Sequence, residues 1–255
     1  MKNLFNIEGK VAVVTGGSRG IGEMIARGYV ENGAKVYISS RKASVCDGLA
    51  EELSQYGTCI SLPFDLSNMD GIEGLAKAVA ERESKLDILV NNAGATWGAP
   101  IDEYPEDGWD KTMDLNTKSI FFLTQKLLPQ LRAAASHEHP SRVINIASVN
   151  GIEPPALETY AYSTSKAGCI MLTRHMAKRL AADNILVNAI APGPFQSHMM
   201  AATLARAGDA IAKSNPRGRI GTPEDIAGVA IFLASRASAY TTGAVVPCDG
   251  GSAEV

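Results

Sequence analysis

The sequence is poor in the residues that build disulfide frameworks and metal sites. Its 255 residues include four cysteines, which lie far apart and form no C-x-x-C pair. Scattered thiols of this kind are typical of reduced proteins, so we expect no disulfide. The four histidines also lack partners at the spacing of metal ligands, and the sequence therefore predicts no metal site. These histidines are His137, His139, His175 and His198.

Long runs of one charge or of apolar residues are also absent. The formal net charge is −3 with a pI near 5.8, and no run of Lys and Arg is longer than the pair Arg41-Lys42. Such a balance gives no reason to expect a nucleic-acid partner or an anionic membrane surface. No stretch reaches the ~18 apolar residues of a membrane span, and residues 1–8 have no apolar signal core. We expect a cytoplasmic protein without membrane contact.

What the sequence does contain is a repeated alternation of short apolar strands and helical segments. A hydrophobic content of 45% over 255 residues is enough for one large core. Continuous β-branched runs indicate strands buried on both faces, as in a parallel sheet. We therefore predict one α/β domain over residues 1–255, a doubly wound Rossmann-type parallel sheet of about seven strands with helices on both faces. The strands are expected at 10–14, 35–39, 58–62, 86–90, 142–147, 184–190 and 243–247.

The first strand runs into a glycine-rich turn, Thr15–Gly22, whose spacing is T-G-x-x-x-G-x-G. A helical pattern follows over residues 21–31 and stops before Gly33, which suits the left-handed position after a helix. Glycines allow a tight turn, and the free N–H groups at the helix start attract a pyrophosphate. The turn predicts a dinucleotide site; its alternative role is merely to pack a helix on the sheet. The expected cofactor contacts are Gly16, Ser18, Arg19, Gly20, Ile21 and Gly22.

The end of the second strand indicates which dinucleotide is bound. An acidic residue there holds the ribose of NAD, whereas a basic residue accommodates the 2′-phosphate of NADP. This chain has Ser40, Arg41 and Lys42 and no acid at that place. We therefore predict NADP(H) as the cofactor. The alternative is an exposed basic pair at a helix start.

Two further strand ends are candidates for nucleotide contact. Asp65 and Leu66 follow the third strand. The Asp65 carboxylate could bind an adenine, or it could cap the next helix in competition with Ser67 or Asn68. The fourth strand ends in small residues, which suit close passage of a nucleotide but also a simple turn. These residues are Asn92, Ala93 and Gly94.

A helical turn after the fifth strand carries the candidate chemistry. Tyr162 and Lys166 are four residues apart, so their side chains share one helix face, whereas Tyr160 should point away from Lys166. An ammonium beside a phenol favours loss of the phenol proton, which makes the pair a candidate proton donor. The spacing alone is also common on solvated helices. Ser148 ends the preceding strand, and Asn116 lies in an otherwise apolar helical segment, where its alternative is a satisfied core amide.

Taken in order, these motifs resemble the classical short-chain dehydrogenase/reductase family over essentially the whole chain. The resemblance implies that Tyr162 protonates a ketone oxygen held by Ser148 as hydride arrives from the nicotinamide. It also implies that Lys166 binds the nicotinamide ribose and that Asn116 positions a water leading protons toward Lys166. The motifs are the Thr15–Gly22 turn, Asn91-Asn92-Ala93-Gly94, Asn116, Ser148, Tyr162 with Lys166, Pro192-Gly193 and Asp249-Gly250-Gly251.

The resemblance also assigns the loop after the sixth strand to the cofactor. The family pattern P-G-x-[IV]-x-T reads here Pro-Gly-Pro-Phe-Gln-Ser over residues 192–197. Ser197 keeps the hydroxyl expected to reach the carboxamide of nicotinamide. Phe195 replaces a smaller residue and is expected to narrow or reshape the pocket. The cofactor contacts implied here and on the catalytic helix are Pro192, Gly193, Phe195, Ser197, Tyr162 and Lys166.

Four further features are Gly16-Gly17-Ser18-Arg19-Gly20, the basic end of the second strand, Gly94-Ala95-Thr96-Trp97-Gly98, and Gly151 after Ser148-Val149-Asn150. In these the sequence most resembles NADPH-dependent 3-oxoacyl reductases, a group that includes the β-ketoacyl reductase of rhamnolipid synthesis. The resemblance implies reduction of a 3-oxoacyl group on acyl carrier protein or CoA, by a homotetramer or homodimer. Substrate choice is expected from residues 96–101, from residues 150–159 and from a lid at residues 194–221. The alternatives are a reductase or dehydrogenase of a sugar, quinone or small ketone, and a non-catalytic cofactor-sensing or scaffold protein.

Overall fold

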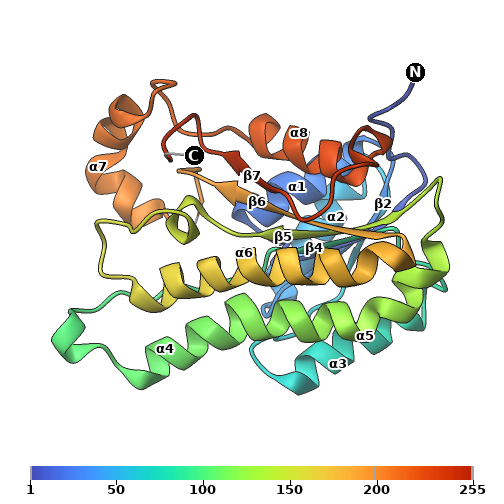
Figure 1. Cartoon of the computed structure of the whole chain (residues 1–255), viewed down its shortest axis with the longest axis horizontal. Helices are drawn as coiled ribbons and strands as arrows, with labels where there is room; N and C mark the ends of the chain where they lie inside the picture. Colours follow the sequence, from blue (N-terminus) through green and yellow to red (C-terminus); the bar gives the residue numbers. More distant parts are fainter. Residues whose placement is uncertain (1, 198, 254–255) are drawn as a thin grey trace.

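The computed structural model describes residues 2–197 and 199–253, which form a three-layer α/β structure around one sheet (Figure 1). All strands are parallel, in the order β3-β2-β1-β4-β5-β6-β7. The predicted doubly wound sheet is confirmed, and each strand lies within two residues of its predicted bounds. The strands are β1 (Val11–Thr15), β2 (Lys35–Ser39), β3 (Cys59–Ser61), β4 (Ile88–Asn91), β5 (Ser141–Ile146), β6 (Ile185–Pro192) and β7 (Val245–Cys248).

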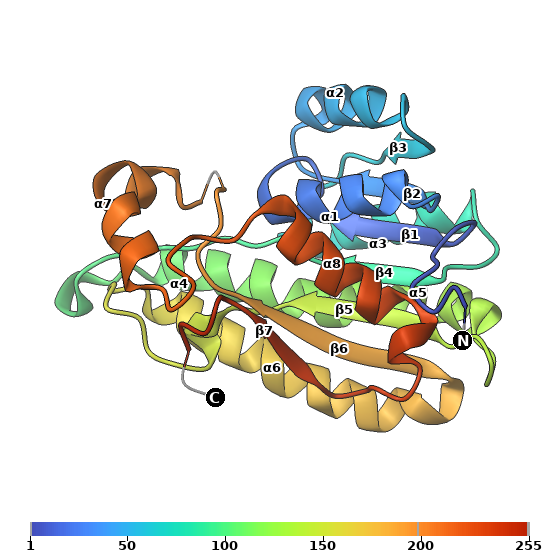
Figure 2. The ribbon, with the colours of Figure 1, turned by 90° about the horizontal axis from the view of Figure 1, so that it is seen from above.

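Helices cover both faces of the sheet, with α3, α5 and α6 on one side and α1, α2 and α8 on the other (Figures 1 and 2). Side chains alternate between the faces of a strand. Val13 and Leu89 therefore pack in the first core layer, and Val14 and Val90 in the second. The helices are α1 (Gly20–Glu31), α2 (Ala43–Leu53), α3 (Met69–Ala80), α4 (Glu106–Met113), α5 (Ser119–Ala134), α6 (Tyr160–Leu180), α7 (Ala201–Ser214) and α8 (Pro223–Ala234).

None of these helices, in the part of the chain that the structure describes, combines the length and the apolar composition needed to cross a bilayer.

The strand order reverses between β1 and β4, which pair in parallel. From β1 the chain crosses to α1 on one face, and from β4 it crosses toward α4 and α5 on the other. Loops that diverge in this way open a crevice at the carboxyl ends of the strands, where doubly wound sheets bind their ligands. The start of α6, α4 and α7 lie at the same end of the molecule, on the left of Figure 1.

The helical segment that carries Asn116 contains an irregularity that the sequence did not predict. α4 continues into α5 through a π-helical turn, Asp114–Lys118, and Asn116 is the central residue of that turn. A π-helical turn inserts an extra residue into the helix, and such turns are frequent at functional sites. Asn116 is completely buried there.

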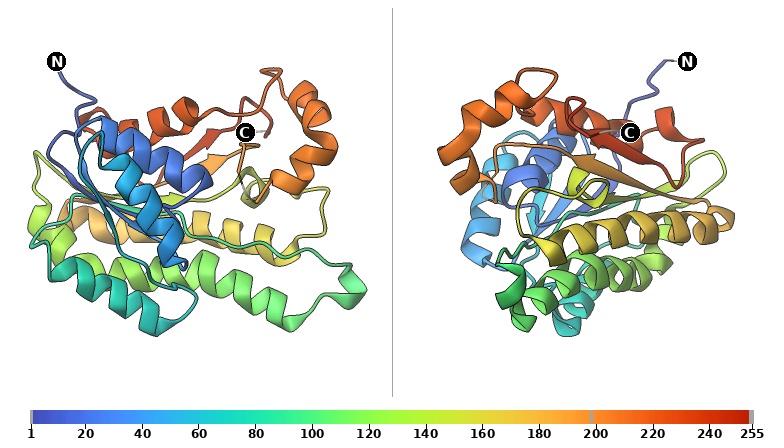
Figure 3. Two further views of the ribbon diagram at one scale, coloured as in Figure 1. Left: turned by 180° about the vertical axis from the view of Figure 1, so that it is seen from behind. Right: turned by 60° about the vertical axis from the view of Figure 1, so that its left-hand side comes forward.

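Residues 194–221 leave the sheet after β6 and return to the same place. Phe195 and Gly221 form an isolated parallel bridge, and the Gly221 amide donates to the Pro194 carbonyl at 2.9 Å. α7, which lies between these ends, has no buried residue and is kinked at Ala207 (φ −139°, ψ 17°). Figure 3 shows α7 standing apart from the sheet, at the end where the loops gather. The segment coincides with the predicted lid, whose function stays a prediction.

Candidate active site

The glycine turn between β1 and α1 depends on two glycines that leave no room for a side chain. Gly16 has φ +61°, and a Cβ built there would lie 2.8 Å from Asn92 Nδ2 and 2.9 Å from Ala93 Cα. A Cβ at Gly22 would overlap the Gly16 carbonyl oxygen. The turn is therefore a cradle that a substitution would fill, as required where a backbone approaches a phosphate closely.

The first turn of α1 is open to an anion. Arg19 occupies the cap position with extended backbone (φ −167°, ψ 164°), and its side chain makes no capping hydrogen bond. The first N–H groups of a helix have no carbonyl partner within it, and the positive end of the helix dipole lies there. This arrangement supports the predicted pyrophosphate contacts of Gly20, Ile21 and Gly22, with Ser18 buried beside them.

Asn92 holds the glycine turn in place from the end of β4. Its side-chain amide donates to the main-chain oxygens of Thr15 at 2.9 Å and Gly16 at 3.1 Å. The main-chain nitrogens of Asn92 and Ala93 donate to the Thr15 hydroxyl at 2.9 and 3.0 Å. Both amide hydrogens of Asn92 are thus used within the protein. A contact of Asn92 with the cofactor would therefore use its side-chain oxygen or its main-chain oxygen.

The ends of β2 and β3 hold unpartnered polar groups where the adenosine end of a dinucleotide is expected. The hydroxyl oxygens of Ser39, Ser40 and Ser61 are shielded from solvent and have no hydrogen-bond partner. Buried hydroxyls without partners are uncommon in native proteins, so these three groups are available to a water or to a polar ligand. Arg41 and Lys42 follow directly and are exposed. The residues present therefore fit the 2′-phosphate and ribose of NADP(H).

Asp65 makes a local contact, and the cap of α3 is a different residue. Asp65 Oδ1 accepts from the Ser67 amide at 3.0 Å, whereas the Asn68 side chain caps α3 by accepting from the Gly71 amide at 2.9 Å. The cap interpretation of Asp65 is therefore wrong for α3. The Leu66 side chain is buried in the core, so a contact of Leu66 with the cofactor would use its main-chain atoms.

Tyr162 and Lys166 lie on α6 beside the end of β5, which leads to Ser148. Lys166 is buried, its Nζ donates to the Ile146 carbonyl at 2.7 Å, and it lies 5.6 Å from the centre of the Tyr162 ring. Ser148 starts the short helix Val149–Gly151, and its hydroxyl accepts from the Asn150 amide at 3.1 Å. The predicted pairing of Tyr162 with Lys166 is thus present in the structure.

Gly151 brings the Ser148 loop against α6. A Cβ at Gly151 would lie 2.6 Å from the carbonyl carbon of Lys166 and 2.8 Å from the Ala167 nitrogen. Only a residue without a side chain allows the two main chains to approach this closely. The sequence gives no local signal for this role of Gly151, because the contact joins segments of different secondary structure.

The Asn116 side chain is fully engaged within the protein. Asn116 Oδ1 accepts from the Ala95 amide at 2.8 Å, and Nδ2 donates to the Ala95 carbonyl at 2.9 Å and to the Ser165 hydroxyl at 2.9 Å. Both amide hydrogens are used, so Asn116 matches the alternative of a satisfied core amide. It joins the loop after β4 to α6, and the water-positioning role implied by the resemblance cannot use these hydrogens.

A second polar chain, missed in the sequence, links β4, β5 and α6 below Ser148. Asn91 Nδ2 donates to Asn145 Oδ1 at 2.9 Å, and Asn145 Nδ2 donates to the Thr173 hydroxyl at 2.9 Å. All three residues are buried. The available signal was an asparagine near the end of each of two apolar strands, because such a side chain needs a buried partner.

The loop after β6 closes over the glycine turn. Ser197 lies beside Gly20, where an added Cβ would be 3.2 Å from the Ser197 Cβ. Gly193 is held by a bond from its amide to the Cys248 carbonyl at 3.0 Å, and Pro192 is buried at the end of β6. A cavity of about 420 Å³ opens here, lined by Gly20, Met24, Gln196, Ser197, Ala201 and Pro223 among others.

Phe195 does not line this cavity. Its side chain is 2% exposed and packs in the core between the sheet, α1 and α8. Its ring fills the space where Gly221 lacks a side chain. The expectation that Phe195 narrows or reshapes the pocket is therefore wrong, because the ring is used to anchor the start of the 194–221 segment. Any cofactor contact of Phe195 is left to its main chain.

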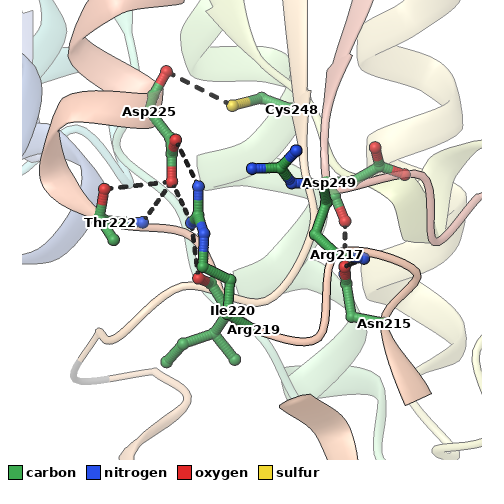
Figure 4. A network of polar contacts seen from close by, with 8 residues as sticks. All are labelled: Asn215, Arg217, Arg219, Ile220, Thr222, Asp225, Cys248 and Asp249. Atoms are coloured by element: carbon green, nitrogen blue, oxygen red, sulfur yellow. Dashed lines mark hydrogen bonds and ion pairs between the residues drawn. The ribbon is translucent and has the colours of Figure 1, made fainter. Parts of the chain in front are cut away.

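The far end of the 194–221 segment is held by two polar clamps (Figure 4). Arg219 pairs with both carboxylate oxygens of Asp225, with the second bond at 3.0 Å, and the Thr222 amide donates to Asp225 Oδ2 at 2.8 Å. The hydrogen bonds from Arg219 and the Thr222 amide hold the pKa of Asp225 well below its usual range. Asn215 Nδ2 donates to the Asp249 carbonyl at 2.6 Å. Thr222 caps α8 and Pro223 is its first residue.

The described residues contain no candidate metal site. Among residues 2–197 and 199–253, no group of three or more His, Cys, Asp or Glu side chains could hold a metal ion. His198 lies outside the described residues. The cysteines are free, and burial raises the pKa of Cys59 to about 12 and that of Cys248 to about 11. Their thiols therefore stay protonated near neutral pH.

The chain matches a family model described as enoyl-(acyl carrier protein) reductase over residues 16–253. It is 50% identical over 253 residues to the rhamnolipids biosynthesis 3-oxoacyl-(acyl-carrier-protein) reductase of Pseudomonas aeruginosa, with 98% of this chain and 99% of that protein covered. It is 34% identical over 246 residues to the 3-oxoacyl-(acyl-carrier-protein) reductase FabG of Thermotoga maritima, with 96% and 98% covered. A solved Pseudomonas aeruginosa RhlG/NADP active-site complex is similar with a TM-score of 0.95 and 49% identity, and 99% of each chain is covered.

Proposed function

Since the chain belongs to the short-chain dehydrogenase/reductase family, we propose that it is an NADPH-dependent carbonyl reductase of 3-oxoacyl groups. The relative that is 50% identical over nearly the whole chain is a 3-oxoacyl-(acyl-carrier-protein) reductase, and a similar solved structure is an NADP complex. The substrate is therefore a 3-oxoacyl thioester on acyl carrier protein or CoA. The family assignment agrees with the motifs found in the sequence.

One observation carries this proposal. The buried Lys166 ammonium lies beside the Tyr162 ring, at the strand end that delivers Ser148. A phenol and a fixed positive charge thus lie beside the end of β5, and the next turn of the chain carries the Ser148 hydroxyl. Reduction of a ketone creates an alkoxide, which needs hydrogen-bond donors and a proton source at that place.

The cofactor would be held by residues from three strand ends. The glycine cradle and the first turn of α1 suit the pyrophosphate, and Ser40, Arg41 and Lys42 suit the 2′-phosphate. When bound, NADPH supplies the hydride. Ser197 at the cavity beside Gly20 is placed to meet the rest of the cofactor.

The protein's own steps concern the substrate oxygen. The Ser148 hydroxyl donates a hydrogen bond to the carbonyl and orients it. The Tyr162 hydroxyl transfers its proton to the same oxygen as negative charge develops there. The Lys166 ammonium favours the phenolate that remains, and its bond to Ile146 fixes it in place. Asn116 keeps the loop after β4 on α6 and acts as a positioning residue.

The test is a substrate panel with NADPH, followed by the loss of absorbance of the reduced cofactor. The panel contains 3-oxoacyl-CoA and 3-oxoacyl carrier-protein thioesters, a 2-enoyl thioester, sugars, quinones and small ketones. We expect the 3-oxoacyl thioesters to give the highest kcat/KM. Preference for a sugar or quinone would replace the substrate assignment. The absence of turnover with every compound would favour a cofactor-sensing or scaffold protein.

We also propose that the chain forms a homotetramer or homodimer. Phe121 on α5 is 40% exposed and Met171 on α6 is 62% exposed, and large exposed apolar side chains are typical of subunit contacts. Light scattering of the purified protein measures the mass directly. Phe121→Asp should lower that mass if this surface joins the subunits.

A further inference from the structure

Four aromatic side chains gather where three segments of the substrate side meet. They come from the loop after β4, from the start of α4 and from the first turn of α6, which lie close together at the left of Figure 1. We call this group the aromatic clasp. Its members are Trp97, Tyr104, Trp109 and Tyr160.

Tyr104 is the centre of the clasp. Its ring meets Tyr160 edge-on at a centroid distance of 5.7 Å and meets Trp109 edge-on at 6.3 Å. Its hydroxyl donates to the main-chain oxygen of Trp97 at 3.1 Å. Edge-to-face packing is the arrangement that aromatic rings prefer. Tyr104 therefore joins the loop, α4 and α6 through one side chain.

Trp97 is seated on α4 at a position that only glycine permits. A Cβ built at Gly108 would lie 2.6 Å from Cγ and from Cδ1 of the Trp97 ring. On the same helix, the Lys111 ammonium lies 5.3 Å from the centre of that ring, a favourable cation–π distance. The indole thus lies flat against α4. It can affect the substrate through the loop that carries it.

The clasped loop starts at the reaction centre. At its beginning, a Cβ on Gly94 would lie 3.7 Å from Lys166 Nζ. Further along, the Ala99 amide donates to the Glu158 carbonyl at 3.2 Å. The loop therefore runs from the catalytic lysine to the segment just before α6. Glu158 and Lys166 flank Tyr162 in the sequence, so the loop contacts the chain on both sides of the proposed proton donor.

We propose that the aromatic clasp determines substrate size, by fixing the loop of residues 96–101 against α6 as a wall for the acyl chain. This inference rests on the proposed function. A small ketone reacting at Tyr162 does not extend to this wall. A long acyl chain does, so the fixed loop contributes to its binding and not to the chemical step. Trp97, Tyr104 and Gly108 are positioning residues, because they act through the loop.

The decisive variant is Gly108→Ala, compared with Gly48→Ala. Alanine at position 108 must displace the Trp97 ring, whereas a Cβ at Gly48 in α2 meets no atom within 4 Å. Alanine has a higher helix propensity than glycine, so both substitutions should stabilise their own helix by a similar amount. For Gly108→Ala we expect kcat/KM of a long-chain 3-oxoacyl-CoA to fall about tenfold, mainly through KM. The values for a small ketone and for NADPH binding should stay within about twofold, as should all values for Gly48→Ala.

Tryptophan fluorescence gives a readout that is independent of turnover. The chain has two tryptophans, and both belong to the clasp. Gly108→Ala should shift their emission, and Gly48→Ala should not. Tyr104→Phe removes only the hydrogen bond from the Tyr104 hydroxyl to the Trp97 main chain. It should also lower kcat/KM for long substrates relative to that for small ones.

Two outcomes overturn the proposal. In one, Gly108→Ala shifts the emission but leaves the ratio of kcat/KM for long and small substrates unchanged. In the other, kcat/KM falls equally for long and for small substrates. The proposed function fails separately, if the wild-type enzyme reduces ketones but no acyl thioester. In that case the clasp is tested with large and small ketones that the enzyme accepts, by the ratio of their kcat/KM values.

Discussion

The Lys166 ammonium lies 5.6 Å from the centre of the Tyr162 ring, one helical turn further along α6. The same nitrogen donates to the main-chain oxygen of Ile146 in β5. The lysine therefore connects the helix that carries the phenol to the strand that leads to Ser148.

Replacement of the phenol tests the proton donor directly. Tyr162→Phe should lower kcat by about 100- to 10,000-fold, because a positioned general acid contributes that much. The Kd of NADPH, measured by fluorescence titration, should change far less than kcat, because the predicted contacts of the pyrophosphate and the 2′-phosphate lie on other elements. Tyr160→Phe is the matched control, since it removes only the hydroxyl that donates to Glu158 at 3.0 Å and keeps the ring that packs on Tyr104. Equal losses in the two variants would contradict the assignment of Tyr162.

A methyl group at Gly151 tests the contact between the Ser148 loop and α6. Gly151→Ala places a Cβ against the main chain of Lys166, so one of the two segments must move. We expect a loss of about 1–3 kcal/mol in the free energy of unfolding, the usual cost of overpacking, together with a fall in kcat. Urea denaturation and initial rates measure the two effects.

Gly228→Ala on α8 is the control for Gly151→Ala, since a Cβ there meets no atom within 4 Å. Alanine in an exposed helix should be neutral or stabilising by up to about 1 kcal/mol. A Gly151→Ala enzyme with wild-type kcat would show that the loop position does not control Ser148.

Truncation of Arg41 tests the cofactor preference. Arg41→Ala should raise KM for NADPH by about 10- to 100-fold, the value of a lost hydrogen bond to a charged group. KM for NADH, which lacks the 2′-phosphate, should change little and provides the internal control. A similar rise for both cofactors would mean that Arg41 shapes the site without binding the phosphate.

The ion pair at the end of the 194–221 segment predicts a pH dependence of stability. The pKa of Asp225 is lowered in the folded protein, chiefly by the Arg219 hydrogen bond, so its stabilising effect is present above the unfolded value of about 3.9 and is lost as pH falls below it. Asp225→Asn should therefore destabilise the protein at neutral pH. The difference from wild type, measured by urea denaturation, should shrink between about pH 4 and pH 2. A difference that is constant over this range would assign the effect to packing.

Local patterns predicted the parts of the fold that local chemistry determines. Thr222 and Pro223 start α8 because a cap residue and a proline at the first position favour a helix start. Gly33 ends α1 with φ +80° for an equally local reason. The strands were found because both of their faces are apolar.

Side-chain direction could not be predicted in the same way. Phe195 is buried under Gly221, and the amide hydrogens of Asn92 and Asn116 are used by main-chain and serine oxygens from distant parts of the sequence. The π-helical turn around Asn116 has no local signal, because it depends on packing against α6. Residue types thus predicted the place of the site, and tertiary contacts determine which atoms remain free in it.

The bond between Gly221 and Pro194 has a consequence for how such enzymes can change. Because the two ends of the segment meet, its length can vary with little effect on the sheet, and each doubling of a loop costs only about 0.6 kcal/mol in closure entropy. Residues between the two ends can therefore be exchanged or inserted without moving the sheet or the helix that carries the catalytic residues. On the prediction that this segment is a substrate lid, replacing residues between these two anchor points would change the substrate while Tyr162 and Lys166 stay where they are.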